Sequence, residues 1–358
     1  MENSKFKTKK TTKTKSKTNT QEKTKERSHM HRLSLQDDLR TNAISSSNKD
    51  ISSLSSQTNK INLTEHIKYI AHISKEGKGD DGLPKTNQDN YLAIDQLLGL
   101  SDAKIYAVMD GHGTAGHLIS NYVKKHFRSQ YENNKAFLTV KNINDLYKLL
   151  TNNNYELIKQ LFSECEKSLD KSGIDITFSG TTCVMVFQIG NHLICANVGD
   201  SRAIMVTSKD EIVQLNRDHK PELPEEKKRI ESKGGEISQY EEDGIKSGPF
   251  RVWKKNEMYP GIAMSRSIGD SIATELGVIS RPEIIEKELQ EGEIKFIIIA
   301  SDGVWEFLSN EDVRDRIMPY YNKKDPLQAC KDLISKSTEY WENEDIVVDD
   351  ITVISLFF

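Results

Sequence analysis

The sequence predicts an α+β fold in which antiparallel β-sheet is covered by amphipathic helices. Three short stretches rich in β-branched residues follow one another closely, at residues 182–189, 193–198 and 203–206. The dipeptides Gly190-Asn191 and Gly199-Asp200, which are typical of tight turns, separate them. Because tight turns leave no room for crossover helices, we expect an antiparallel meander here and exclude a doubly wound parallel sheet.

The same patterns predict the other elements in order. Further strands are expected at residues 105–109, 296–300 and 351–358. Apolar residues at helical spacing indicate helices within 115–127 and 157–169, and the Asn-rich residues 152–154 indicate a loop between them. A third helix should begin at Pro224 and end before Gly234-Gly235. Each helix needs a sheet to cover its apolar face.

The composition allows a large buried core. Of the 358 residues, 36% are hydrophobic and 29% are charged, which suits one large domain or two ordinary ones. The longest buried-type stretch, residues 296–300, is far shorter than the roughly 18 to 20 apolar residues that cross a bilayer. The N-terminus lacks an apolar signal core and has Glu2 where myristoylation needs glycine. We therefore expect no membrane span and an intracellular location, cytoplasmic, nuclear or both.

The four cysteines do not form a zinc or disulfide motif. They have no CxxC spacing and lie mostly among apolar residues, at Cys165, Cys183, Cys195 and Cys330. We expect buried thiols.

The N-terminal segment differs in charge from the rest of the chain. Residues 1–30 hold ten Lys or Arg against three Glu, a net charge of +7, which leaves 40 basic against 51 acidic residues and a net charge of −11 for the remainder. Such a segment buries too little apolar surface to offset its ordering entropy. We expect a disordered tail over residues 1–60, basic and then Ser-rich, and a folded domain over residues 61–358.

The basic tail has two interpretations. Clustered lysines bind nucleic acid or an anionic membrane through counterion release, whereas a low-complexity extension is simply solvated. The tail has no interleaved aromatic residues beyond Phe6 and no compact Lys/Arg block. The solvated extension is therefore favoured, and nucleic-acid binding is not expected.

Aspartates at the ends of predicted strands are the most informative feature for function. Apolar strands run directly into Asp110-Gly111 and Asp302-Gly303, and two more strands are preceded by Asp89 and by Asp349-Asp350. A single Asp-Gly pair usually marks only a turn. Four such sites on rigid strand ends can converge, and clustered carboxylates repel one another unless a cation neutralises them. Oxygen ligands of this kind suit magnesium or manganese.

Residues 111–116 also match the dinucleotide-binding pattern GxGxxG. Asp110, directly before this pattern, would repel a pyrophosphate, and the sheet is predicted to be antiparallel. A nicotinamide-dependent enzyme is therefore not expected.

Eight short motifs in order give the chain a family resemblance. They are NQD (87–89), DGHG (110–113), SGTT (179–182), NVGDSR (197–202), DHKP (218–221), MSRSIGD (264–270), SDGVW (301–305) and DDITV (349–353). In these motifs the sequence resembles the metal-dependent Ser/Thr protein phosphatases of type 2C, the PPM family, over roughly residues 66–357. Residues 251–253 and Pro260-Gly261 resemble the flap variant of plant and protist members.

The resemblance implies a fold and a mechanism. The fold would be a central β-sandwich of two antiparallel sheets flanked by antiparallel helix pairs, in four layers. Two Mg²⁺ or Mn²⁺ ions would lie at one end of it, with a weaker third ion nearby. By analogy the metal ligands are Asp110, the Gly111 carbonyl, Asp302 and Asp349, with Asp89 in support and Asp200 at the third ion. A metal-bridging hydroxide would attack phosphorus in line, without a covalent phosphoenzyme, and His112 would protonate the leaving oxygen.

Three residues depart from the family pattern. Gln88 stands where many members have Glu, which weakens the expected ligand set for one metal. Pro84 stands where an Arg commonly binds the substrate phosphate, so Lys85 is the nearest replacement cation, or else an ordinary loop lysine. Asp350 replaces the usual Asn and adds a negative charge, which would strengthen metal attraction.

The predicted function is that of a hydrolase that dephosphorylates phosphoserine and phosphothreonine in signalling proteins. Its partners would be phosphoprotein substrates, and it would act as a monomer. Gln88 and the missing Arg motivate one alternative, a catalytically weak member that acts as a regulatory binding module. A metal-dependent hydrolase of small phosphate esters or nucleotides is another. Whether Trp253 in the flap packs internally or docks a partner is left open.

Overall fold

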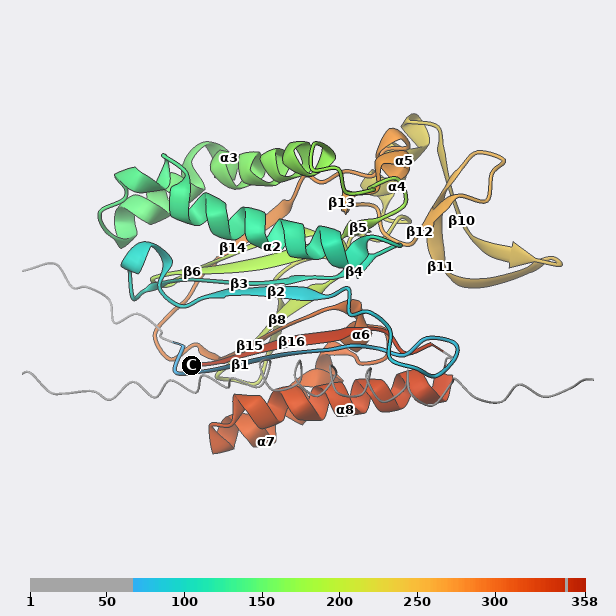
Figure 1. Ribbon diagram of the computed structural model, residues 1–358. Coiled ribbons are helices and arrows are strands. Elements are labelled where there is room, and N and C mark those ends of the chain that lie inside the picture. Colours follow the sequence, from blue (N-terminus) through green and yellow to red (C-terminus); the bar gives the residue numbers. More distant parts are fainter. Residues whose placement is uncertain (1–66, 345–346) are drawn as a thin grey trace, which may run out of the picture. The chain divides into compact units, whose positions relative to one another are not determined.

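The computed structural model describes residues 67–344 and 347–358, and the predicted tail and the domain start near residue 61 lie outside them. Two five-stranded sheets form the centre of the described part (Figure 1). One sheet has the order β1 (Tyr69–Lys75), β16 (Ile351–Phe357), β15 (Ile294–Ala300), β8 (Arg202–Thr207) and β9 (Ile212–Gln214). The other has the order β14 (Glu283–Glu288), β7 (His192–Val198), β6 (Cys183–Ile189), β3 (Ala103–Met109) and β2 (Asn90–Ile94).

All strand pairings within these two sheets are antiparallel. The predicted meander is correct for β6 and β7 but wrong for the third strand, because β8 pairs with β15 in the opposite sheet. The chain changes sheets at Gly199, which has φ +101° and packs against Thr182 so closely that a Cβ would lie 2.6 Å from its methyl carbon. β6 and β8 are both buried on their two faces, so hydrophobicity alone could not assign β8 to a sheet.

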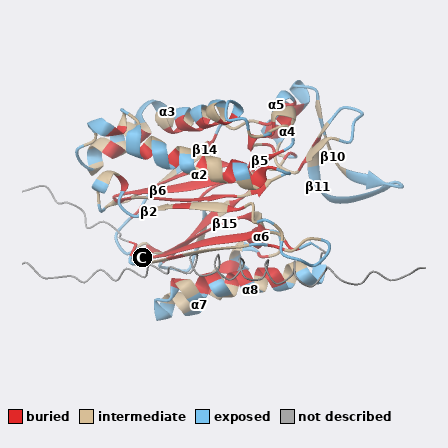
Figure 2. Cartoon of the chain, viewed as in Figure 1, coloured by how far each residue is buried: buried red, intermediate tan, exposed pale blue. Residues whose placement is uncertain are grey.

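Side chains alternate between two apolar layers along the strands. In β15, Ile297 and Ile299 face the core between the sheets, whereas Phe296 and Ile298 face helices α7 (Asn310–Lys323) and α8 (Pro326–Glu344). On the other sheet the outward residues pack against α2 (Gly116–Asn133) and α3 (Ile143–Asp170). The result is a helix–sheet–sheet–helix arrangement in four layers, with the buried residues of each layer turned inward (Figures 1 and 2). The predicted fold class is confirmed.

The helices agree with the predicted patterns and extend them. α3 contains non-helical backbone at Asn152 to Tyr155, as the predicted loop requires. α4 (Pro224–Ser232) begins with proline and is followed by Gly234. The short elements are η1 (Leu97–Gly99), η2 (Phe137–Thr139), α5 (Ser271–Glu275) and α6 (Asp302–Trp305). None of the described helices combines the length and hydropathy that crossing a bilayer would need.

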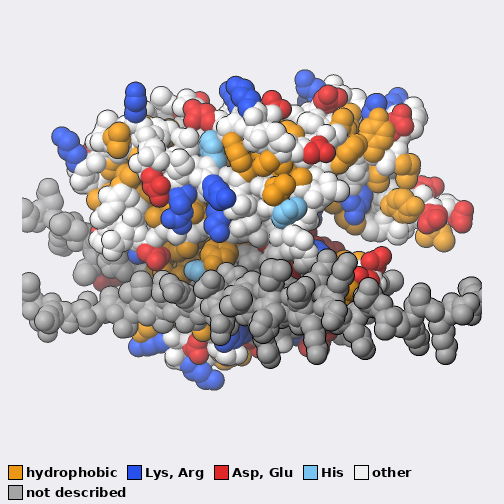
Figure 3. Space-filling view, viewed as in Figure 1, with side chains coloured by type: hydrophobic (Ala, Val, Ile, Leu, Met, Phe, Trp, Pro, Cys, Tyr) orange, Lys and Arg blue, Asp and Glu red, His pale blue; other side chains and the backbone are white. Residues whose placement is uncertain are grey.

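A flap formed by β10 (Gly235–Glu242), β11 (Ile245–Lys254) and β12 (Pro260–Ile262) extends beyond the sandwich (Figure 1). Trp253 packs internally: its indole N–H donates to the Ser238 carbonyl at 3.1 Å, and its ring covers Gly261. Several large apolar side chains of the flap are instead exposed, and hydrophobic side chains gather at this end of the face in Figure 3. All four cysteines are buried and free, as predicted.

Candidate active site

Strand register brings the predicted carboxylates to one end of the sandwich. β2 pairs with β3 so that Asn90 lies opposite Met109, which places Asp89 and Asp110 side by side at the ends of these strands. β15 pairs with β16 so that Ala300 lies opposite Val353, which places Asp302 near the residues before β16. Each sheet thus supplies carboxylates at its own strand ends.

Hydrogen bonds join the two sets of carboxylates across the sandwich. The Ser301 hydroxyl, on the β15 side, donates to Asp89 Oδ2 at 2.8 Å. The Asp110 and Asp302 carboxyl groups lie close enough to hydrogen-bond when one of them is protonated. The convergence predicted from the sequence is therefore present for these three aspartates.

Burial and mutual repulsion keep these groups from ionising easily. Burial, followed by the charge of Asp350, raises the pKa of Asp89 to about 8. Burial and then Asp349 raise the pKa of Asp302 to about 7. Burial and then Asp302 raise the pKa of Asp110 well above its usual range. Such a cluster carries excess negative charge at neutral pH unless protons or cations compensate it.

Lys85 lies within the acidic cluster. Its Nζ is 2.6 Å from Asp349 Oδ1 and 3.6 Å from Asp350 Oδ2. Although burial opposes its charge, Asp349 and Asp350 raise the pKa of the Lys85 ammonium. Lys85 is therefore a charged member of the site, not a loop lysine in solvent.

Asp350 accepts hydrogen bonds from two backbone segments beside the site. The Gly77 N–H donates to its Oδ1 at 2.7 Å, and the Gln88 N–H donates to its Oδ2 at 2.8 Å. Both oxygens are thus used to hold backbone segments beside the site. Its charge acts on the neighbouring carboxyl groups from a fixed position.

Gln88 makes two hydrogen bonds beside the site. The Gln88 side-chain amide N–H donates to the Gly113 carbonyl at 2.6 Å. The main-chain carbonyl of Gln88 accepts a hydrogen bond from the Ser120 hydroxyl at 2.6 Å. A Glu at this position could not make the first of these bonds. Gln88 therefore ties the segment before β2 to the turn that follows His112.

Asp200 and Lys220 form a second ion pair at the site. Lys220 Nζ lies 2.6 Å from Asp200 Oδ2, and Asp200 is buried. Burial opposes the charge of Lys220, but Asp200 and Asp302 raise its pKa above the usual range. Because Asp302 acts on Lys220, the Asp200 pair adjoins the main carboxylate cluster.

The donor set fits divalent cations. Asp89 Oδ1, Asp200 Oδ1 and Asp302 Oδ1 are buried and have no hydrogen-bond partner among the described residues. Unpartnered carboxylate oxygens are costly when buried, and magnesium and manganese bind oxygen ligands of this kind. Within residues 67–344 and 347–358, however, no three His, Cys, Asp or Glu side chains already surround one point where they could hold a metal ion. Lys85 and Lys220 each pair with one carboxylate of this set, Asp349 and Asp200.

His112 is paired with a carboxylate to which the sequence assigned no role. Its Nε2 lies 2.6 Å from Asp270 Oδ2, and its Nδ1 is buried without a partner. Burial alone would lower the pKa of His112, but Asp270 outweighs burial and raises it. Asp270 ends the MSRSIGD motif, but nothing in the local sequence pairs it with His112.

A small three-stranded sheet sets the position of this pair. It consists of β13 (Ile268–Gly269), β5 (Gly180–Thr181) and β4 (Gly111–His112). His112 lies opposite Gly180, where a Cβ would be 2.0 Å from Asp270 Oδ2. Glycine at 180 is therefore required for the close approach of Asp270 to His112.

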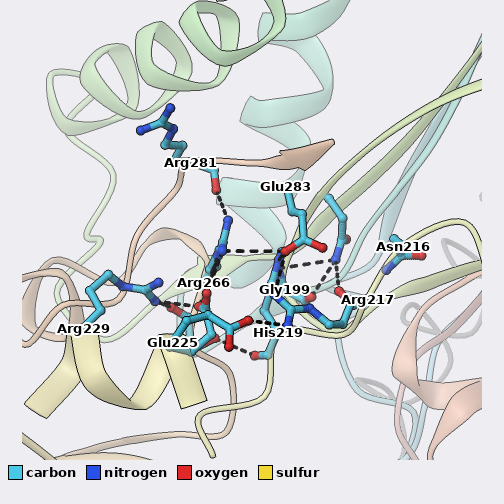
Figure 4. A network of polar contacts seen from close by, with 12 residues as sticks. Gly199, Asn216, Arg217, His219, Glu225, Arg229, Arg266, Arg281 and Glu283 are labelled. Carbon is cyan, nitrogen blue, oxygen red and sulfur yellow. Dashed lines mark hydrogen bonds and ion pairs between the residues drawn. The ribbon is translucent and has the colours of Figure 1, made fainter. Parts of the chain in front are cut away.

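A buried polar network anchors the segment before β13 (Figure 4). Glu226 of α4 is fully buried and accepts hydrogen bonds from Arg229, Arg266 and Ser265. These donors, Arg266 first, overcome burial and hold the pKa of Glu226 well below its usual range. His219 joins the same network, because the Ser265 N–H donates to its carbonyl at 2.8 Å. The network therefore links α4 to the segments that carry Lys220 and Asp270.

Comparisons with known proteins agree with the fold and the motifs. The profile of the protein phosphatase 2C family matches residues 78–346. Probable protein phosphatase 2C 35 of Arabidopsis thaliana is 31% identical over 300 residues, covering 79% of this chain and 81% of that protein. Probable protein phosphatase 2C 73 of Oryza sativa subsp. japonica is 32% identical over 316 residues, covering 81% of this chain and 73% of that protein.

Solved structures show the same fold at lower identity. The crystal structure of serine-threonine phosphatase 2C from Toxoplasma gondii superposes with a TM-score of 0.67 at 20% identity, covering 83% of this chain and 97% of that one. A C. elegans sex determining protein superposes with a TM-score of 0.59 at 19% identity, covering 82% and 65%. With the family profile spanning most of the described residues, the chain belongs to the protein phosphatase 2C family.

Proposed function

We propose that this chain is a divalent-metal-dependent protein phosphatase that hydrolyses phosphoserine and phosphothreonine. The observation that carries the proposal is the meeting of carboxylates from both sheets beside a carboxylate-paired histidine, Asp270–His112. Family membership supports the reaction class.

The residues that would hold two Mg²⁺ or Mn²⁺ ions are Asp110, the Gly111 carbonyl, Asp302 and Asp349, with Asp89 in support. Asp200 would hold a weaker third ion. When bound, such ions stabilise negative charge on phosphate oxygens and lower the pKa of a water that can attack phosphorus. Because one unpartnered oxygen each of Asp89, Asp200 and Asp302 is already buried, these side chains can bind a cation without losing a hydrogen bond there.

His112 would serve as the general acid. Asp270 holds Nε2 and favours the protonated ring, and a proton on Nδ1 would have no competing acceptor within the described part of the chain. In-line attack of water on phosphorus breaks the bond to the Ser or Thr oxygen, and that oxygen takes the His112 proton. The products are the free hydroxyl side chain and inorganic phosphate, without a phosphoenzyme.

Lys85 would attract the substrate phosphate. It is the cation nearest to Asp349, and its side chain is partly accessible. Its ammonium group offers a point charge instead of the two-pronged contact of a guanidinium. Substrate binding should therefore depend on Lys85, with looser orientation of the phosphate.

The remaining features fit an intracellular enzyme that acts as a single chain. Four free, buried thiols are typical of a reducing compartment, which supports a cytoplasmic or nuclear location. All proposed site residues come from one chain, so a monomer can assemble the site. Its partners would be phosphoproteins.

Phosphate release from a phosphothreonine peptide and from a nucleoside triphosphate, each with and without Mn²⁺, tests the proposal. We expect Mn²⁺-dependent release from the peptide and little from the nucleotide. Preferential nucleotide hydrolysis would indicate a hydrolase of small phosphorylated molecules such as nucleotides instead. Peptide binding without release under any metal condition would indicate a regulatory binding module.

A further inference from the structure

The carboxylate of Glu166 in α3 accepts a hydrogen bond from the main chain one residue before Asp270. The Gly269 N–H donates to Glu166 Oε2 at 3.1 Å. Gly269 has φ +100° and Asp270 has φ +49°, so both residues occupy the left-handed region. For Asp270, which is not a glycine, this conformation is unfavourable unless contacts around it hold it.

The conformation at residues 269–270 determines where the Asp270 carboxylate points. The Asp270 N–H donates to the Ser179 carbonyl at 2.9 Å, and the Thr274 hydroxyl donates to the Gly269 carbonyl at 3.2 Å. The carboxylate then lies 2.6 Å from His112 Nε2. A rotation of the Gly269 peptide would move this carboxylate away from the imidazole.

The environment of Glu166 suits a fixed acceptor. Burial raises the pKa of Glu166 to about 7, the Gly269 N–H opposes the rise, and the charge of Asp270 adds to it. Glu166 is thus close enough to Asp270 for the two charges to interact, although no proposed metal ligand is among its hydrogen-bond partners. A neutral side chain that still offers an oxygen should therefore serve nearly as well as the carboxylate.

We propose that Glu166 is a positioning residue for leaving-group protonation: by holding the Gly269 peptide, it orients Asp270 and, through Asp270, the imidazole of His112. This inference rests on the proposed function, because it assigns Glu166 to the acid step of that reaction. It adds α3, which lies on the outer face of the sandwich, to the elements that control the chemistry.

The test compares two phosphate esters that differ in their need for an acid. Glu166→Ala should lower kcat on a phosphothreonine peptide by roughly 10-fold or more, and on p-nitrophenyl phosphate by less than about 3-fold, because the aryl oxide leaves with little protonation. Glu166→Gln keeps an acceptor oxygen and should restore most of the peptide activity. Glu164→Ala, at an exposed position in the same helix, is the matched control and should leave both rates unchanged.

A double-mutant cycle separates positioning from a general structural effect. In a His112→Ala background, Glu166→Ala should cause little further loss on the peptide, since both changes remove the same step. The proposal would be overturned if Glu166→Ala lowered kcat equally on both esters. It would also be overturned if the fold-losses of the two single variants multiplied in the double variant.

Amide exchange at Gly269, followed by NMR in the full chain, provides a readout that does not depend on turnover. Exchange should be faster in Glu166→Ala and close to wild type in Glu166→Gln, with the melting temperature showing that both variants fold. Unchanged exchange in Glu166→Ala would contradict the hydrogen bond on which the proposal is based. If wild type fails to hydrolyse the peptide while Gly269 exchange responds as expected, the proposed function is wrong and the positioning contact is right.

Discussion

The ammonium group of Lys85 lies 2.6 Å from the Asp349 carboxylate, so a lysine of the chain itself neutralises one of the proposed metal ligands. A bound divalent cation would share Asp349 with this lysine, and the two positive charges would repel each other. Metal binding and phosphate binding therefore depend on the same side chain in opposite ways.

Replacing Lys85 by Met should strengthen Mn²⁺ binding and weaken substrate binding. We expect the Kd for Mn²⁺, measured by calorimetry, to fall roughly three- to tenfold, which corresponds to about 1 kcal/mol of repulsion removed. The KM for a phosphothreonine peptide should rise in the same variant. Lys78→Met, which removes an exposed lysine paired with Glu342, is the control. If the Lys85 variant binds Mn²⁺ as wild type does, Lys85 does not compete with the metal.

The metal-free protein should lose stability as the pH rises from about 4 to 8. The pKa of Asp89 is raised to about 8, so between its unfolded value near 3.9 and this folded value the native state holds a proton that the unfolded chain has released. The native state is therefore favoured at the acidic end of this range, and Asp89→Asn should remove that contribution.

Chemical denaturation in chelator at several pH values measures this effect. The stability of Asp89→Asn relative to wild type should increase by at least ~1 kcal/mol from pH 5 to pH 8. Asp80→Asn, at an exposed position, should show no such trend. Excess Mn²⁺ should flatten the wild-type profile, because a cation then replaces the protons. Parallel profiles for wild type and Asp89→Asn would show that Asp89 titrates normally.

Removing Glu226 should destabilise the fold far more than removing an exposed Glu of the same helix. Glu226→Ala leaves Arg266 and Arg229 without their buried partner, and breaking such a pair typically costs about 3–5 kcal/mol. Glu231→Ala removes only an exposed pair with Lys227 and should cost at most ~0.5 kcal/mol. Urea unfolding measures the free energy of unfolding of both variants. Similar decreases in the two variants would mean that the network is not a main anchor of α4.

Replacing Gln88 by Glu should have two separable effects. The variant loses the amide donor to the Gly113 carbonyl, so the metal-free protein should be less stable by about 0.5–1.5 kcal/mol. The added negative charge near Asp89 should at the same time lower the Mn²⁺ concentration at half saturation. Gln96→Glu, at an exposed position, should change neither quantity. An unmoved Mn²⁺ titration would place residue 88 outside the reach of the metals.

Periodicity and strand-end residues were sufficient to predict most of the sandwich. The apolar runs of β6, β7 and β15 are visible in the sequence because nearly all of their side chains are buried. The pairing partner of β8 was not predictable, since a strand buried on both faces fits either sheet. The short strand β14 was not predicted, because its sequence EIIEKE carries as many charges as an ordinary surface segment and so shows no buried face.

The candidate site was predicted in its composition but not in its pairings. Asp89, Asp110 and Asp302 follow from their positions at strand ends. The contacts of His112 with Asp270 and of Lys85 with Asp349 join residues that are 158 and 264 positions apart, and local sequence contains no signal for them. The backbone N–H groups that Asp350 accepts, from Gly77 and Gln88, were likewise not predictable from the local sequence. The motif pattern identifies which residues matter, and the fold determines what each one contacts.

The most direct test of the account is phosphate release from a phosphothreonine peptide as Mn²⁺ is added back to chelator-treated protein. Wild type should be inactive in chelator and should recover fully and saturably with Mn²⁺, whereas Asp302→Asn should remain at least ~100-fold slower at saturation. Asp315→Asn, which changes an exposed carboxylate, should follow wild type. Full activity in excess chelator, or wild-type rates from Asp302→Asn, would contradict the claim that these converging carboxylates bind the metal ions that make the chain a phosphatase.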